Sequence, residues 1–123
     1  MLINYSNHPS NLWPEEQKKA AIHQFHQIID EPFPYINPHD PIDEIKKLAF
    51  SEFNKIHNKY NHSPYAMHIM GEHTYIFLLI QIFLKNHVPC FASTTHRIVT
   101  EKNNIKQSTF QFIQFRPYIL IDS

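Results

Sequence analysis

Three hydroxyl residues, a histidine and an arginine follow an apolar run in the last third of the chain. Residues 93–97 read Ser-Thr-Thr-His-Arg. Hydroxyl groups, backbone amides and a guanidinium fork together suit the oxygens of a phosphate group. The candidate phosphate ligands are therefore Ser93, Thr94, Thr95 and Arg97. In the competing interpretation the hydroxyls cap a turn and the arginine forms a structural ion pair.

A second polar segment lies close to the N-terminus. Asn7, His8 and Ser10 belong to a stretch of turn residues over positions 6–11. His8 is a candidate proton donor or acceptor, because histidine changes its charge near neutral pH, and capping of the loop is the alternative role. Arg116 is the only arginine besides Arg97, and it is the second candidate for positive charge at a phosphate.

The single glycine of the chain marks a third segment, which continues through Glu72, His73 and Thr74. Gly71 stands where an apolar strand-like run meets an apolar helix-like run. A missing Cβ at such a junction allows close approach, either of a neighbouring part of the protein or of a ligand on the helix N-terminus. Glu72 would repel a phosphate unless it binds a ribose hydroxyl, and it is equally suited to the first turn of the helix.

Several classes of function are disfavoured by what the sequence lacks. The ten histidines show no metal-ligand spacing, so no metal site and no cofactor are expected. The chain has no glycine-rich phosphate loop, dinucleotide fingerprint or nucleophile elbow, which argues against ATPase, NAD-dependent and α/β-hydrolase chemistry. A formal net charge of zero argues against a protein that coats long nucleic acids.

The expected location is the cytoplasm. Cys90 is the only cysteine, so no disulfide can form within the chain, and its apolar context predicts a buried thiol rather than a nucleophile. The N-terminus does not have the pattern of a signal peptide. The apolar run over residues 75–84 is too short to span a membrane.

The order of apolar runs predicts the fold that positions these segments. Strands are expected at residues 2–5, 27–30, 65–70 and 88–92, with helices between them and a ribbon of residues 98–100 and 109–115 at the end. A phase break before Phe115 indicates a bulge. We predict one domain over residues 1–123, a doubly wound Rossmann-like α/β fold with a parallel sheet, a central first strand and a C-terminal antiparallel β-ribbon. Ligands of such sheets bind beyond the carboxyl ends of the strands, here the first, third and fourth.

The sequence also predicts which side chains two of the helices bury. The helix that begins near Pro14 is predicted to bury Ala20, Ala21, Ile22 and Phe25. The helix over residues 72–86 is apolar nearly all round, which predicts that it is deeply buried or covered by a partner.

The combination of these motifs resembles a known group of proteins. Asn7 and His8, Gly71, the segment over residues 92–97 and the terminal run over residues 112–118 are similar to small CRISPR-associated accessory proteins of Rossmann-like fold, which are related to CARF domains. The resemblance extends over about residues 4–118. Ser93 and Arg97 match the CARF spacing of a hydroxyl four residues before a basic side chain. The sequence departs from the pattern at Phe91 and in the turn around Gly71.

The resemblance implies a function in type III antiviral defence. Several such families are ring nucleases, which cleave cyclic oligoadenylates such as cyclic tetra-adenylate without a metal. A ribose 2′-hydroxyl attacks the adjacent phosphate and leaves a 2′,3′-cyclic phosphate. The implied catalytic residues are His8, Arg97 and Arg116. The implied ligand-binding residues are Asn7, Ser10, Gly71, Glu72, His73, Thr74, Ser93, Thr94 and Thr95.

A ligand of approximate two-fold symmetry implies a homodimer that shares one ring. Two alternatives stay open at this point. In the first, the protein is a non-catalytic sensor or sponge for the same ring, because binding and in-line attack need the same positioning groups. In the second, it is a small Rossmann-like protein that binds an unrelated nucleotide.

Overall fold

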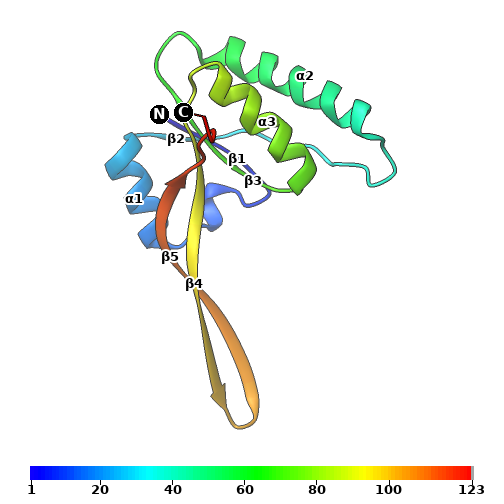
Figure 1. The fold of residues 1–123 in the computed structure, drawn as a ribbon. Coiled ribbons are helices and arrows are strands. Elements are labelled where there is room, and N and C mark those ends of the chain that lie inside the picture. The colour runs from blue at the N-terminus through cyan, green and yellow to red at the C-terminus, as the bar shows by residue number, and fades with distance from the viewer. Residues whose placement is uncertain (123) are drawn as a thin grey trace.

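A computed structural model describes residues 1–122 of the chain (Figure 1). Over these residues the chain forms one five-stranded sheet, three α-helices and a short 3₁₀ turn. The strands are β1 (Leu2–Ser6), β2 (Ile28–Asp30), β3 (Ala66–Met70), β4 (Cys90–Lys102) and β5 (Ile105–Pro117). The helices are α1 (Glu15–Phe25), α2 (Ile42–Tyr60) and α3 (His73–Lys85), and the 3₁₀ turn is η1 (Ser10–Leu12).

The sheet is mixed and has the strand order β2-β1-β3-β4-β5. β1 pairs in parallel with β2 and β3, and β3 pairs in parallel with β4. β5 runs antiparallel to β4. The expected α/β class and the antiparallel C-terminal pair are confirmed. The expectation that the first strand is central is wrong, because β3 holds the centre of the five strands.

Helices cover both faces of the sheet (Figure 1). Ile3, Tyr5, Met67 and Ile69 pack in one apolar core with buried residues of α2 and α3. Leu2 and Ala66, which alternate with them along the strands, pack in a second core with Ala21 and Phe25 of α1 and with Phe112 and Phe115 of β5. Successive side chains of a strand point to opposite faces, so the apolar runs of β1 and β3 serve both cores.

The buried stripe of α1 differs from the predicted one. Gln17, Ala21 and Phe25 are buried, a spacing of four that keeps them on one side of the helix. Ile22 stands one residue away from this stripe and is 49% exposed, so its expected burial is wrong.

β4 and β5 form a long ribbon that projects from the body of the protein (Figure 1). Asn103 and Asn104 both have positive φ, 55° and 62°, as a tight hairpin turn between two strands requires. The register shifts between Thr94 and Thr95, which confirms the bulge expected from the phase break before Phe115. Residues 93–97 therefore continue a strand, and their prediction as a loop at a strand end is wrong.

Gly71 is explained by packing. A Cβ atom built on Gly71 would lie 2.8 Å from Cε1 and Cε2 of the Phe33 ring and closer still to its Cζ. This ring is wedged between Tyr5 and Tyr75, with ring centroids 5.1 Å and 5.7 Å away. The absence of a Cβ allows the Phe33 ring to close the core at this corner, which supports the packing alternative over a ligand contact.

The expected burial of Cys90 is confirmed. Cys90 is 1% exposed, and this burial raises the pKa of its thiol to about 12, as expected for a small core residue. In the part of the chain that the structure describes, no helix has both the length and the apolar character to cross a membrane.

Candidate functional site

A cavity with both polar and apolar lining lies near the carboxyl ends of β1 and β3 and beside the first half of β4, on the face of the sheet that carries α1. Its volume is about 470 Å³. The strands contribute Ser6, His68, Met70, Ser93 and Thr95, the β1–α1 loop contributes His8, and the remaining lining residues are Leu12, Trp13, Pro14, Gln17 and Phe110. The cavity thus brings together parts of the loop after β1 and of residues 93–97. These two segments are about 85 positions apart in the sequence.

Asn4 is the centre of the hydrogen bonds beneath this cavity. Its side-chain nitrogen donates to Asp30 Oδ1 at 2.7 Å and to the backbone oxygen of His8 at 2.9 Å. Both partners can only accept, so the orientation of the amide is fixed. The amide oxygen must then face the other way, where it accepts from Ser6 Oγ at 2.8 Å and lies 2.9 Å from His68 Nδ1.

His68 is the buried histidine of the site. It is 2% exposed, and its ring packs edge-on against Trp13 and Phe115, with centroids 5.1 Å and 5.7 Å away. Burial, with a smaller contribution from the nearby His8, lowers the pKa of His68 to about 4. The ring is therefore neutral at pH 7.

Asp30 ends the hydrogen-bonded chain at the protein surface. Its carboxylate accepts from the backbone amide of Ser10 at 3.1 Å and from Ser10 Oγ at 2.8 Å, besides the bond from Asn4. Desolvation acts to raise the pKa of Asp30, but the hydrogen bonds from Asn4 and Ser10 outweigh it and hold the pKa below its usual value. Ser10, predicted as a ligand-binding residue, thus fastens the loop after β1 to the end of β2.

The two arginines occupy different faces of the ribbon. Arg97 pairs with Phe110, which lines the cavity, and it lies on the cavity face two residues beyond Thr95. Its guanidinium donates to the exposed Ser108 Oγ at 3.0 Å, and Arg97 is not among the residues that line the cavity. Arg116 pairs with Ala92 and faces the opposite side of the sheet. The structure does not bring Arg116 to this cavity.

Thr94 also lies off the site. It alternates with Ser93 and Thr95 along β4 and so faces away from the cavity, and its hydroxyl donates to the backbone oxygen of Gln114 at 3.3 Å. Asn7 borders a neighbouring cavity between the ends of β1 and β2, together with residues 30–35. Neither residue lines the cavity that holds His8 and Ser93.

The segment around Gly71 forms the start of α3. The Glu72 carboxylate accepts from the backbone amide of Tyr75 and from Thr74 Oγ1, both at 2.7 Å. Both hydrogen bonds lower the pKa of Glu72, and the bond from Thr74 has the larger effect. Because Glu72 and Thr74 cap the helix, the structural alternative weighed for Glu72 explains both residues. His73 borders a groove on the far side of α3, away from the cavity that holds His8 and Ser93.

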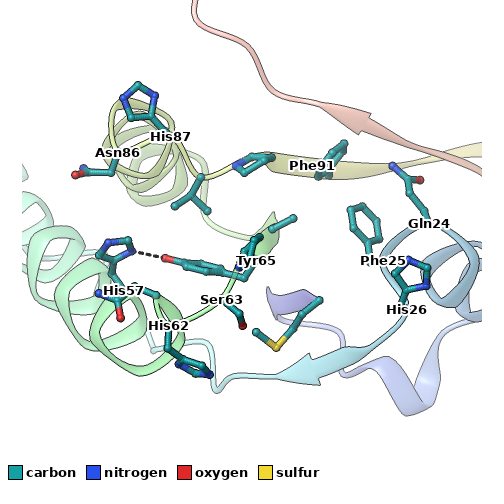
Figure 2. Close-up of a pocket in the computed structure, with 16 residues that line it drawn as sticks. Gln24, Phe25, His26, His57, His62, Ser63, Tyr65, Asn86, His87 and Phe91 are labelled. Atoms are coloured by element: carbon teal, nitrogen blue, oxygen red, sulfur yellow. Dashed lines mark hydrogen bonds between the residues drawn. The ribbon is translucent and has the colours of Figure 1, made fainter.

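A larger cavity lies at the opposite edge of the sheet, near the amino ends of β1, β3 and β4 (Figure 2). It has a volume of about 750 Å³ and is bordered by His26, His57, His62 and His87 among others. His57 Nδ1 lies 2.7 Å from the Tyr65 hydroxyl. Over residues 1–122 no group of three or more histidine, cysteine, aspartate or glutamate side chains has the arrangement of a metal site. We place the candidate site at the smaller cavity, because a continuous chain of buried polar groups opens into it.

Sequence reasoning missed Asn4, Asp30 and His68, which form the hydrogen-bonded network, and also lining residues such as Trp13 and Phe110. A signal was present for two of them, because Asn4 and His68 are polar side chains inside otherwise apolar strand runs. Such residues need hydrogen-bond partners when they are buried. In the structure Asn4 and His68 stand directly opposite each other on β1 and β3.

The fold and the cavity define an α/β protein with a pocket near the carboxyl ends of β1 and β3, into which polar side chains of the sheet open. Residues 1–116 match the profile of the uncharacterized protein MJ1673 family, and the chain belongs to this family. Neither the curated proteins nor the solved structures contain a match to this chain.

Proposed function

We propose that the protein binds a cyclic oligoadenylate, with cyclic tetra-adenylate as the first choice, in the cavity near the carboxyl ends of β1 and β3, and that it cleaves the ring. The observation that carries this proposal is the convergence of His8, Ser93 and Thr95 on one cavity. The α/β architecture, in which helices lie on both faces of a sheet with parallel strands (Figure 1), is also compatible with nucleotide binding at the strand ends.

The cavity and the ribbon beside it offer the two contacts that an adenine nucleotide needs. Phe110 lines the cavity and is 62% exposed, so its ring is free to stack on a base. Arg97 lies beside it on β4 and would turn from Ser108 to a phosphate at the cost of two exposed hydrogen bonds. The cavity volume of about 470 Å³ falls in the usual range for small-molecule sites.

Cleavage in this proposal uses the ribose 2′-hydroxyl of the ring as the nucleophile. The oxygen attacks the adjacent phosphorus once the two are held in line. The protein then supplies positive charge at the phosphate, through Arg97, and groups that move protons, among which His8 lines the cavity.

We also propose a homodimer in the cytoplasm, so that two chains share one ring. α3 buries most of its apolar side chains within its own chain, which accounts for much of its apolar character. Phe77 is nonetheless 67% exposed and Ile119 is 76% exposed. Both border an apolar groove of about 510 Å³ between α3 and the segment after β5. This groove lies on the other face of the sheet from the cavity, so a second copy that covers it would form a different contact from the one that shares the ring.

The purified wild-type protein is expected to convert cyclic tetra-adenylate to linear di-adenylate with a 2′,3′-cyclic phosphate in the presence of EDTA, as followed by liquid chromatography and mass spectrometry. Arg97→Ala is expected to weaken binding roughly tenfold to a hundredfold, because a lost charged hydrogen bond is worth about 1.5–3 kcal/mol.

Arg116→Ala provides the comparison, because this arginine faces the other side of the sheet. An equal loss in both variants would contradict the proposed location of the site. Tight binding without product would favour a sensor or sponge, and failure to bind any cyclic oligoadenylate would overturn the proposal.

A further inference from the structure

We propose that Ser93 and His68 form a proton relay in which Ser93 Oγ accepts the hydrogen of a ligand hydroxyl while its own hydrogen passes to His68 Nε2. This inference rests on the proposed function and names the group of the ligand, a ribose 2′-hydroxyl, that the inner end of the cavity would contact. Neither His68 nor a direction for the Ser93 hydrogen bond follows from the sequence.

Hydrogen bonds link Asp30, Asn4, His68 and Ser93 in series. The direction of each bond follows from the first one, because the Asp30 carboxylate on β2 can only accept. Asp30 and the His8 carbonyl accept from the Asn4 side-chain nitrogen, so the Asn4 oxygen faces His68 Nδ1 at 2.9 Å. Two acceptors cannot face each other at this distance, and Nδ1 must therefore carry a hydrogen. A neutral imidazole has only one N–H, so Nε2 is left with a lone pair.

Ser93 is the donor that this lone pair requires. Its Oγ lies 3.2 Å from His68 Nε2 and also 3.1 Å from Met70 Sδ. A thioether is a weak acceptor, whereas a buried imidazole nitrogen without a donor would cost about 1–3 kcal/mol. The Ser93 hydrogen therefore points to His68, and the lone pairs of Ser93 Oγ are left for the cavity. At this spot the protein accepts a hydrogen bond rather than donating one, so a ribose hydroxyl suits it better than a phosphate oxygen.

The 2′-hydroxyl gives its proton to Ser93 Oγ as its oxygen bonds to phosphorus, and the Ser93 proton moves to His68 Nε2. The bond from phosphorus to the 5′ oxygen breaks, and this oxygen takes a proton from His8, which lines the same cavity. The titratable groups near His68 are His8, which contributes to its lowered pKa, and Asp30, which is linked to it through Asn4. The Asn4 oxygen holds the Nδ1 hydrogen before and after the transfer.

Long-range proton–nitrogen spectra of the ¹⁵N-labelled full chain test the hydrogen-bond directions without any ligand. At pH 7 we expect His68 to show a protonated Nδ1 and an unprotonated Nε2, with its signals assigned by their absence in His68→Gln. A protonated Nε2 would overturn the relay.

Single-turnover cleavage of cyclic tetra-adenylate tests the transfer. Ser93→Ala is expected to slow cleavage about 10²–10⁴-fold, as for a lost acid–base group, with a change in affinity below about tenfold. The double variant with His68→Gln should be no slower than Ser93→Ala alone, because the two residues act as a unit. Thr100→Ala, a hydroxyl on the exposed ribbon, should match the wild type.

The outcomes separate the two proposals. Independent, additive losses in the double variant, or an unchanged rate in Ser93→Ala, would overturn the relay and leave ring cleavage intact. A wild type that does not cleave the ring would overturn the proposed function together with the transfer step, while the spectra would still decide the hydrogen-bond directions.

Discussion

Asn4→Ala is expected to lower the free energy of unfolding by about 3 kcal/mol, with a fall of roughly 10 °C in Tm. The substitution leaves His68 Nδ1 without its acceptor and removes a donor from the Asp30 carboxylate. The cost is this large because Asn4 is 1% exposed, and water cannot readily replace the lost partners. Urea denaturation of both proteins measures the difference.

Asn11→Ala is the matched control for this experiment. Asn11 is exposed and lies in η1, close to the same loop, so its truncation should change the free energy of unfolding by less than about 0.5 kcal/mol. If Asn4→Ala cost as little as Asn11→Ala, the hydrogen-bonded chain across β2, β1 and β3 would not contribute to stability, and the account of the site would be wrong.

Acidification from pH 7 to pH 4 is expected to remove about 3 kcal/mol of stability through His68 alone. The pKa of His68 is about 4 in the folded protein and about 6.5 in an unfolded chain. As the pH falls through this window the unfolded state takes up a proton first, so the loss begins near pH 6.5 and is complete near pH 4. Asp30, Glu31 and Glu72, whose pKa values are lowered, add their losses at the acidic end of the window and below it.

Urea midpoints measured over this pH range for the wild type, His68→Gln and His62→Gln test this prediction. His62 is exposed, so His62→Gln should reproduce the wild-type curve, whereas His68→Gln should flatten it between pH 6.5 and pH 4.5. Direct titration of the His68 ring by NMR provides a second measurement that does not depend on a variant. A midpoint near 6.5 for His68 would contradict its burial in the neutral form.

Much of the fold could be predicted because it depends on local patterns. The apolar spacing of α2 places Ile45, Ala49, Phe53, Ile56 and Tyr60 in the core, and the phase break in β5 correctly indicates the bulge. The prediction that β4 ends before residue 93 is wrong for a physical reason. Residues 93–97 are polar because their strand leaves the body of the protein, and polarity without burial resembles a turn in the sequence.

The candidate site could be predicted only in outline. The carboxyl edge of the sheet is where the polar segments lie, but which side chains meet there depends on register and on the face that each residue presents. Arg97 and Arg116 look equivalent in sequence, yet they face opposite sides of the ribbon. The pairing of Asn4 with His68 depends on the alignment of β1 with β3, which no local pattern specifies.

The most direct test of the central claim is the fluorescence of Trp13 during rapid titration with cyclic tetra-adenylate. Trp13 is the only tryptophan of the chain and lines the cavity, so a ligand that enters this site changes its surroundings. We predict a saturable change that reaches its end point at one ring per two chains. Binding of the ring, shown by calorimetry, with unchanged Trp13 fluorescence would contradict the assignment of this cavity as the site.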